Sequence, residues 1–439
     1  MKPSNLYICI RPTDKFPDFE KSNCMRKLFL ILLQLCFITP IVKSQSSRTG
    51  IHKTKLDTQI DSILNSQVAN DLIPGAVIQI KKDGKILYKQ AYGYSQKYDI
   101  NHNLLNPPVP MNTATLFDMA SLTKVIGTTT SIMLLVDRGL INVNDPVGKY
   151  IPAFDTGAKK AITIRNLLTH TAGLIEWYPL FYFSHNKETT YKLIGELPLK
   201  YPVVKQRRYS DLGFILLQEI IEKISGMPLD KFERKNIFGP LGMTHTMYNP
   251  LQHGRTTNIA ATSLGNPYET RMVYDSSLGY SVKGLDPKSW NGWRKHVLKG
   301  EVNDGNAWYA NGGIAGSAGL FSTVDDIQKL VDMLMNKGKV GNKQFISSRV
   351  IDSFFVKDQF NNGLGWMMDT TDSFIKDGPE GTFGHTGFTG TGIMVVPKYN
   401  LSIILLINRQ NMGLLKSGFY YNVNPVRKAV FETVLSYCR

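Results

Sequence analysis

The chain has 439 residues, of which 42% are hydrophobic, 10% aromatic and 20% charged. This composition is typical of a globular protein with two or three lobes, and it excludes a mostly disordered chain, a collagen-like repeat and a multi-span membrane protein. The formal net charge is +16, from 51 Lys and Arg against 35 Asp and Glu. Because the basic residues are scattered and no zinc-finger spacing accompanies them, the charge indicates a basic, soluble surface and no nucleic-acid partner.

The N-terminal segment has the pattern of an export signal. A basic triplet at 25–27 precedes an apolar run from Leu28 to Val42, and serines follow within 44–47. A cationic start, a short apolar stretch and a small-residue exit are typical of a secretory signal. We therefore expect residues 1–44 to be an extension with a signal peptide or an uncleaved anchor, and the protein to be exported to the periplasm or cell envelope. Met25 is a second candidate start, and a buried N-terminal helix is the alternative interpretation.

Cysteine usage predicts a fold without disulfides. Cys9, Cys24 and Cys36 lie at or before the signal, so the remaining chain keeps only Cys438. That leaves no internal disulfide and no cysteine metal site, and stability must come from a large core. No His-Glu-x-x-His motif occurs, and we expect neither a metal nor a cofactor.

The first elements in chain order are a hairpin and two helices. Asp83-Gly84 separates apolar runs at 77–80 and 86–88, which predicts a β-hairpin. A mixed apolar and Thr-rich segment at 119–139 predicts a mostly buried helix. Apolar residues at helical spacing then follow Ser210, the expected N-cap, and Gly226 is expected to end that helix.

The second half of the chain is richer in loops and strands. Residues 240–310 are rich in Gly, Asn, Pro and Thr and predict loops, whereas Asp325 to Met335 is an amphipathic helix. Two strands, 393–396 and 401–407, are expected around a turn, and a last helix is expected from Val426 to Leu435.

This order of elements predicts an α/β (α+β) fold. Strands come first, helices and loops follow, and strands with a helix end the chain, so we expect an antiparallel sheet from both chain ends, flanked by helices, with an inserted helical subdomain. In domain 45–439 we expect the sheet part at about 55–115 and 310–439, and the helical and loop part at about 116–309.

The first candidate for chemistry is Ser121-Leu-Thr-Lys124. A serine hydroxyl needs a base, and residues three apart on a helix share a face, so Lys124 can lie beside Ser121. A lysine acts as a base only if burial or neighbours suppress its charge. The same S-x-x-K pattern occurs at Ser184 and Ser373, but in polar, loop-like surroundings. Ser121 opens a long apolar helix with Asp118 as a candidate cap, and we favour it.

The second candidate is Tyr209-Ser210-Asp211. A tyrosine beside a lysine can relay protons if its pKa falls. Rival patterns occur at 309–311 and 420–422. We favour Tyr209 because it immediately precedes a helix start, which fixes its orientation; a surface tyrosine at a helix cap is the alternative.

The third candidate is His385-Thr386-Gly387, which leads into the strand at 393–396. A cationic or hydrogen-bonding side chain there could hold a substrate carboxylate, and Gly387 would let the substrate backbone approach closely. Taken alone, the motif is better explained as a strand-edge histidine without a role.

Together the three motifs occur in an order that resembles the penicillin-recognising serine hydrolases, which comprise class C β-lactamases, low-molecular-mass D-alanyl-D-alanine carboxypeptidases and related esterases. The resemblance covers about residues 55–437, and the surrounding segments that carry it are 116–124, 144–152, 167–174 and 384–390. Within that family the chain is most similar to the penicillin-binding protein 4B type, through residues 150–152, 245–250, 259–262, 306–309 and 312–322.

The resemblance implies an acyl-enzyme mechanism on a mixed α/β sandwich with a helical subdomain. Ser121 would be the nucleophile, Lys124 its general base, and Tyr209 the residue that relays protons to the leaving group and later activates water.

The resemblance also implies the residues that hold the substrate. His385 and Thr386 would bind it beside Gly387, and the backbone N–H groups of Ser121 and Phe388 would form the oxyanion hole.

The chain departs from the family pattern at several positions. Asp211 replaces the commoner Asn, and if ionised beside Lys124 it would keep that lysine protonated; if it points away, nothing follows. His385 replaces the Lys of β-lactamases, which lowers the expected rate of β-lactam hydrolysis. Further substitutions, which bear on substrate preference, are Asn303, Gly305 and Ser317.

We therefore expect a D-alanyl-D-alanine carboxypeptidase that acts on peptidoglycan stem peptides. The partner is a small peptide or peptidoglycan fragment, with membrane anchoring through the N-terminal segment left open. The alternatives are an esterase, β-lactamase or muramyl-peptide amidase with the same mechanism, and a silent penicillin-binding sensor. An intact Ser121, Lys124 and Tyr209 argues against the silent sensor, whereas Asp211 keeps it open.

Overall fold

Two distant parts of the chain combine in one six-stranded antiparallel sheet, whose strand order is β11-β12-β13-β1-β2-β3. The computed structural model describes residues 53–439, so the predicted signal segment and the three cysteines that lie within or before it are outside the described residues. The strands are β1 (Gly75–Lys82), β2 (Lys85–Tyr98), β3 (Leu104–Pro110), β11 (Phe383–Thr386), β12 (Gly392–Val396) and β13 (Leu401–Ile407). This confirms the predicted antiparallel sheet built from both chain ends.

The hairpin between β1 and β2 forms where the sequence predicts it. Asp83 has φ +49° and Gly84 has φ +77°. Two successive residues with positive φ make the tight turn whose twist matches that of paired strands. The predicted strand at 401–407 coincides with β13.

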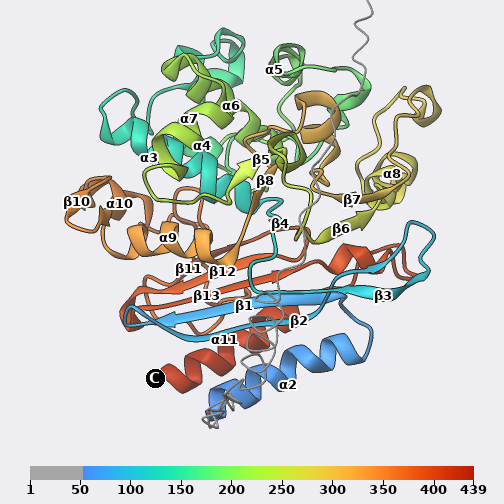
Figure 1. Cartoon of the computed structure of the whole chain (residues 1–439). Coiled ribbons are helices and arrows are strands. Elements are labelled where there is room, and N and C mark those ends of the chain that lie inside the picture. The colour runs from blue at the N-terminus through green and yellow to red at the C-terminus, as the bar shows by residue number, and fades with distance from the viewer. Residues whose placement is uncertain (1–52) are drawn as a thin grey trace, which may run out of the picture. The chain divides into compact units, whose positions relative to one another are not determined.

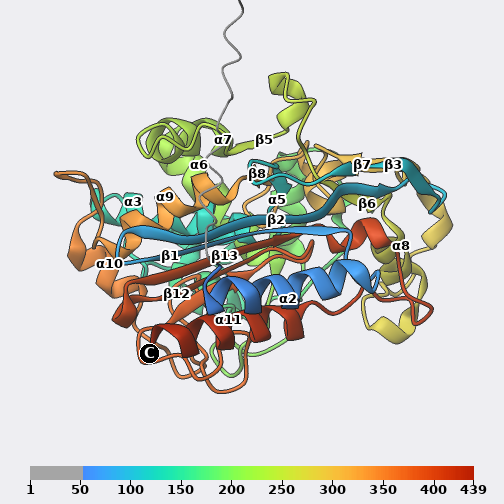
Figure 2. The same ribbon diagram turned by 60° about the horizontal axis from the view of Figure 1, so that its bottom comes forward.

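Helices cover both faces of the sheet (Figures 1 and 2). Among residues 53–439, the first and last helices, α2 (Lys55–Ala69) and α11 (Asn424–Cys438), pack against each other on one face. Along β1 the buried residues Ala76, Ile78 and Ile80 belong to the core beneath these helices, whereas Val77 belongs to the core on the opposite face. This alternation is that of a strand buried on both sides.

The opposite face carries the helical subdomain and α9 (Figure 1). Its longer helices are α3 (Thr130–Asp137), α4 (Ile164–Leu168), α5 (Lys187–Glu196), α6 (Asp211–Ser225), α7 (Leu229–Glu233), α8 (Pro267–Tyr274), α9 (Val324–Met335) and α10 (Ser348–Phe354). π-Helical turns occur at η1 (Lys124–Thr129), η6 (Arg234–Phe238) and η10 (Asn306–Ala310). The short strands are β4 (Phe117–Asp118), β5 (Met247–Tyr248), β6 (Ala261–Leu264), β7 (Val297–Lys299), β8 (Leu320–Ser322), β9 (Lys339–Val340) and β10 (Lys343–Gln344).

Two of the expected helices differ little from those observed. The buried helix expected at 119–139 is η1 followed by α3. α6 begins after Ser210 and ends at Gly226, which has φ +65°, as predicted. However, the Ser210 hydroxyl does not cap the helix and donates instead to the Ile175 carbonyl at 2.7 Å.

The expectation of loops throughout 240–310 is wrong in part. This region contains β5, β6, β7 and α8 between irregular segments. β6 pairs with β7 across more than thirty residues, as in the pair Ala261 and Lys299. Such short strands are stabilised by distant partners, and their own sequences carry little periodicity.

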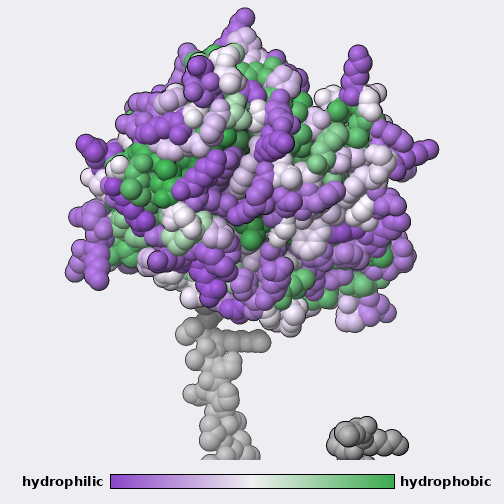
Figure 3. All heavy atoms as spheres, turned by 90° about the horizontal axis from the view of Figure 1, so that it is seen from above, coloured by the Kyte–Doolittle hydropathy of each residue, from purple (hydrophilic) through white to green (hydrophobic). Residues whose placement is uncertain are grey.

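The surface seen from above the helical subdomain is mostly hydrophilic and is interrupted by separate hydrophobic patches (Figure 3). Among residues 53–439, no helix combines the length and the apolar character needed to cross a bilayer.

Candidate functional site

Ser121 lies in a tight turn between β4 and η1. The preceding residue, Ala120, has φ +45°, a left-handed conformation that is strained for a side chain with a Cβ. Asp118 fixes this turn, because its carboxylate accepts hydrogen bonds from the Ala120 N–H at 2.8 Å and the Asn303 N–H at 2.7 Å. Burial raises the pKa of Asp118 to about 6. The predicted capping residue thus holds the turn that presents Ser121.

Lys124 is fully buried one helical turn after Ser121. Its Nζ donates to Ser121 Oγ at 3.0 Å and to the Ser317 carbonyl at 2.9 Å, and it pairs with Asp211 Oδ1 at 2.7 Å. An ammonium has three N–H donors, and these contacts use all three. Burial alone would lower the pKa of Lys124, but Asp211 and then Tyr209 outweigh it and raise the pKa. Lys124 is therefore an ammonium in the resting site, and Asp211 points toward it.

Tyr209 packs beside this pair. Its ring centroid lies 5.0 Å from Lys124 Nζ, and burial raises the pKa of its hydroxyl against the opposing charge of Lys124. The ring is held by His170, whose centroid is 4.3 Å away and whose Nδ1 accepts a hydrogen bond from the Ser210 N–H at 3.1 Å. The sequence interpretation gave His170 no role. The signal that points to His170 is the segment 167–174, which contains it and carries part of the family resemblance.

His385 and Thr386 end β11 at the edge of the sheet. The His385 Nδ1 lies 2.9 Å from the Thr386 carbonyl oxygen. Because a carbonyl oxygen only accepts, Nδ1 carries the proton. Burial, followed by the charge of Lys124, lowers the pKa of His385 to about 3. The lowered pKa favours the hydrogen-bonding role of His385 over the cationic one.

Gly387 and Phe388 continue from β11 toward the nucleophile. A Cβ at Gly387 would lie 2.5 Å from the Met119 carbonyl oxygen, so only glycine permits this close approach to the segment before Ser121. The Phe388 carbonyl accepts from Arg409 Nε at 3.0 Å and Nη2 at 2.7 Å, which fixes this loop. The oxyanion hole of Ser121 and Phe388 N–H groups stays a prediction.

Two cavities meet at Ser121, and Ser121, Tyr209 and Phe388 line both of them. The first, of about 330 Å³, we call the acidic lobe, and its other lining residues are Ala120, Glu176, Trp177, Asp211, Tyr268, Glu269, Met272, Tyr280, Asn303, Asp304 and Ala318. The second, of about 320 Å³, we call the cationic lobe, and its other lining residues are Arg207, Met367, His385, Thr386, Gly387, Arg409, Asn422, Asn424 and Arg427. A substrate bound across Ser121 therefore meets opposite charges on its two sides.

The departures from the family pattern lie in or beside this cleft. Asn303 lines the acidic lobe, and the Gly305 N–H donates to Glu269 at 2.7 Å. Burial raises the pKa values of Asp304 and Glu269, with smaller contributions from neighbouring carboxylates. Ser317 contacts Lys124 through its carbonyl, while its buried hydroxyl has no partner within residues 53–439.

The rival motifs are engaged elsewhere. Ser184 Oγ bonds the hydroxyls of neighbouring threonines, and its Lys187 pairs with Glu222 at 2.9 Å. Ser373 Oγ donates to the Asp369 carbonyl. Neither serine is hydrogen-bonded to a lysine, in contrast to Ser121.

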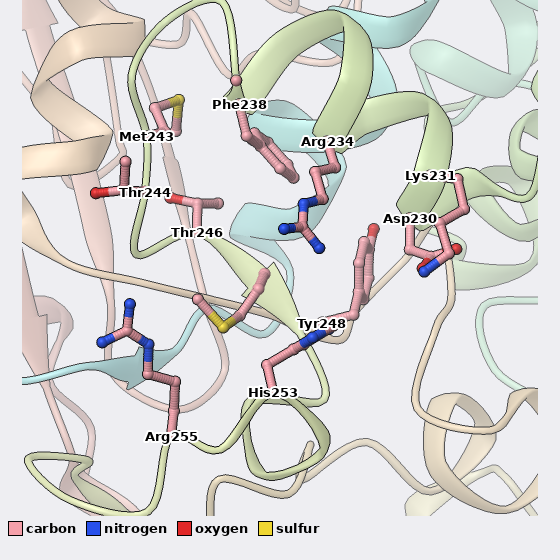
Figure 4. Close-up of a pocket in the computed structure, with 12 residues that line it drawn as sticks. Asp230, Lys231, Arg234, Phe238, Met243, Thr244, Thr246, Tyr248, His253 and Arg255 are labelled. Atoms are coloured by element: carbon pink, nitrogen blue, oxygen red, sulfur yellow. The ribbon is translucent and has the colours of Figure 1, made fainter.

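A further cavity, of about 430 Å³, lies between α7, η6, β5 and η7 (Pro250–His253) (Figure 4). Lys231, Arg234 and Arg255 are exposed basic residues of its lining. No residue of the three motifs lines it, and the catalytic interpretation therefore rests on the cleft at Ser121.

Comparison with known proteins agrees with this geometry. A family model described as Beta-lactamase matches residues 60–421. The chain belongs to the beta-lactamase family. It is 33% identical over 391 residues to the N-acetylmuramyl-L-alanine amidase of Bacillus subtilis (strain 168), with 84% of this chain and 85% of that protein covered. It is 32% identical over 389 residues to an Escherichia coli (strain K12) protein provisionally named D-alanyl-D-alanine carboxypeptidase, with 84% and 86% covered.

Solved structures share the beta-lactamase fold. A class C beta-lactamase aligns with a TM-score of 0.64 at 18% identity, over 88% of this chain and 98% of that one. The hydrolase EstCE1 aligns with a TM-score of 0.62 at 20% identity, over 86% and 98%. The family and the fold together make this chain a beta-lactamase-fold serine hydrolase.

Proposed function

We propose that the chain is an exported serine hydrolase of peptidoglycan stem peptides that acts as a D-alanyl-D-alanine carboxypeptidase. The observation that carries the proposal is the contact of Ser121 Oγ with Lys124 Nζ at 3.0 Å, where the acidic and cationic lobes meet. A nucleophile hydrogen-bonded to a buried amine, with Tyr209 beside both, is the arrangement that acyl transfer needs.

Acylation starts from the molecules in which Lys124 is neutral. Its amine then accepts the Ser121 hydroxyl proton as Oγ attacks the substrate carbonyl and a C–O bond forms. The resulting oxyanion is stabilised by the N–H groups of Ser121 and Phe388. Lys124 returns the proton through the Tyr209 hydroxyl to the leaving amine as the C–N bond breaks. Water, activated along the same path, then hydrolyses the ester and restores the Ser121 hydroxyl.

The two lobes support a peptide substrate with a charged leaving group. A C-terminal D-alanine leaves with a carboxylate, and the cationic lobe offers three arginines for its charge, Arg207, Arg409 and Arg427. The relative from Escherichia coli that is provisionally named a carboxypeptidase agrees with this substrate class.

A muramyl-peptide amidase is the second candidate, and the walls of the acidic lobe favour it. Trp177, Tyr268 and Tyr280 line this lobe together with carboxylates. Flat aromatic faces and hydrogen-bond acceptors suit a sugar ring as the acyl part of the substrate. The Bacillus subtilis relative carries this activity in its name.

The proposal is tested by comparing wild-type protein with Ser121→Ala on two substrates, a D-Ala-D-Ala pentapeptide and an N-acetylmuramyl-L-alanyl peptide. We expect release of D-alanine by wild type and a loss of about 10⁴-fold or more in Ser121→Ala, because the nucleophile is gone. Mass spectrometry of the products identifies which bond is cut.

Ser373→Ala is the matched control, since Ser373 belongs to a rival S-x-x-K pattern and should leave turnover intact. If wild type releases the intact peptide from the muramyl substrate but no D-alanine from the pentapeptide, the activity is that of the amidase and not of the carboxypeptidase. Undiminished turnover by Ser121→Ala would refute a serine mechanism altogether.

A further inference from the structure

The third motif supplies no positive charge to the cationic lobe. His385 Nδ1 carries its proton toward the Thr386 carbonyl at 2.9 Å, and burial of the side chain disfavours a second proton on the ring, so Nε2 holds a lone pair. A lone pair repels a carboxylate oxygen. If a substrate carboxylate binds in this lobe, another side chain must receive it.

In two of the three arginines of the cationic lobe, both terminal guanidinium nitrogens donate hydrogen bonds to the protein. Arg409 donates to the carbonyls of Phe388 and Tyr421 at 2.7–3.0 Å. Arg427 Nη2 donates to the carbonyls of Gly387 and Thr391 at 3.0 and 2.7 Å. Its Nη1 donates to Asn424 Oδ1 at 2.7 Å. These two guanidinium groups hold the loop after β11 in place and contribute only a diffuse positive field.

Arg207 differs from both. It lines the cationic lobe beside Ser121, with its guanidinium carbon 6.0 Å from the Tyr209 ring centroid. Within residues 53–439 its terminal guanidinium nitrogens form no hydrogen bond, in contrast to those of Arg409 and Arg427. Its Nε is also buried without a partner, as is that of Arg427. Asp358 and Asp369 act on it through space, and neither forms an ion pair with it in the described part of the chain. A largely buried guanidinium without a carboxylate is costly, and Arg207 lines the same lobe as Ser121.

We infer that Arg207 is the specificity-determining residue of the cleft, and that it binds the carboxylate of the substrate's leaving group with its free guanidinium edge. The inference rests on the proposed function, which supplies a leaving group on the cationic side of Ser121. By this inference Arg207 binds the substrate carboxylate, whereas the sequence motif makes His385 the candidate for that role. The expected substrates are acyl donors whose leaving group carries a carboxylate close to the scissile bond.

A matched pair of depsipeptide esters tests this inference. The two esters share one acyl group, and their leaving group ends in either a carboxylate or a carboxamide. We expect wild type to prefer the carboxylate ester. Arg207→Gln should lose about 10- to 100-fold in kcat/KM on that ester, the size of one charge-assisted hydrogen bond, mainly through KM. The loss on the carboxamide ester should be several-fold smaller.

Two further variants separate recognition from folding. Arg207→Lys keeps the charge and should restore part of the carboxylate preference. Arg208→Gln removes the neighbouring arginine, which is exposed, lies 5.1 Å from the Tyr201 ring and does not line the lobe, and it should behave as wild type. Equal losses on both esters in Arg207→Gln, or equal use of both esters by wild type, would overturn the inference.

Failure of the proposed function gives a different result. If wild type turns over neither ester, calorimetry on Ser121→Ala with a D-Ala-D-Ala peptide and its C-terminal amide still decides the role of Arg207. If Ser121→Ala binds the free acid more tightly than the amide, and the double variant Ser121→Ala/Arg207→Gln loses this preference, the role of Arg207 is supported. Equal binding of the acid and the amide by Ser121→Ala refutes that role.

Discussion

Asp211 contacts the ammonium of Lys124 at 2.7 Å, and this one contact governs the proton chemistry of the cleft. In the family pattern, Asn is the commoner residue at this position. An amide there would leave Lys124 without a counter-ion. Burial would then favour the neutral amine, which is the form that accepts a proton from Ser121. The carboxylate therefore stabilises the resting site and holds the base in its inactive state.

Asp211→Asn should make acylation faster at neutral pH. The carboxylate raises the pKa of Lys124, so its removal lowers that pKa and increases the neutral fraction at any pH below it. The rising limb of the kcat/KM profile against pH should move to lower pH by about one to two units. Stopped-flow ester hydrolysis between pH 5 and about pH 10 measures this limb.

Glu222→Gln is the control for this shift, because Glu222 lies on the same helix α6 and pairs with Lys187 outside the cleft. Its profile should coincide with that of wild type. A limb that stays in place, or moves to higher pH, in Asp211→Asn would mean that Lys124 is not the titrating base.

At the scale of elements, the sequence could predict what short-range rules decide. The β1–β2 hairpin follows from Asp83-Gly84, and the pair Ser121 and Lys124 follows from helical spacing. The contact of Lys124 with Asp211 could not be predicted, because it joins η1 to α6 and depends on which way a side chain turns. Arg207 gave no signal either, since its importance lies in the partner that it lacks. Both the Lys124–Asp211 contact and the lack of a partner for Arg207 depend on long-range packing, which cannot be predicted from the pattern of a single sequence.

The approach of β11 to the nucleophile gives a prediction for Gly387→Ala. The added Cβ would collide with the Thr391 hydroxyl and lie 2.5 Å from the Met119 carbonyl oxygen. The loop after β11 must then move away from Ser121, and a displacement of about 1 Å costs about 10²-fold in rate. We expect that loss in ester hydrolysis, with a fall in unfolding free energy of about 1–3 kcal/mol from overpacking.

Gly213→Ala is the matched control for that substitution. Gly213 lies in α6 next to the site, and an added Cβ would meet the Leu167 carbonyl oxygen at an ordinary 3.5 Å. Activity should be retained, and thermal unfolding should show a neutral or slightly stabilising effect, because alanine favours a helix over glycine. Full activity in Gly387→Ala would show that the loop after β11 tolerates displacement.

At the scale of the whole molecule, the two chain ends are tied together. α2 and α11 pack on one face of a sheet whose strands come from both ends. The cleft at Ser121 lies at the β11 edge of this sheet, and α11 contributes Asn424 and Arg427 to its lining. The described residues therefore form one folding unit that begins at Lys53. Because α2 starts at Lys55, a signal segment that ends near residue 44 can be removed without cutting into an element of this unit.

Export is the prediction that belongs to this scale, and it concerns the segment 1–44. Deletion of residues 2–24 should leave export unchanged, since the basic triplet and the apolar run of the signal both remain. Leu32→Arg places a charge in the middle of the apolar run and should retain the protein in the cytosol. Cell fractionation with antibody detection measures both, and N-terminal sequencing of the exported protein locates the cut. A cut near residue 44 would establish a cleaved signal, whereas an intact N-terminus on membrane-bound protein would establish an anchor. Export of Leu32→Arg at the wild-type level would show that the apolar run at 28–42 is not the signal.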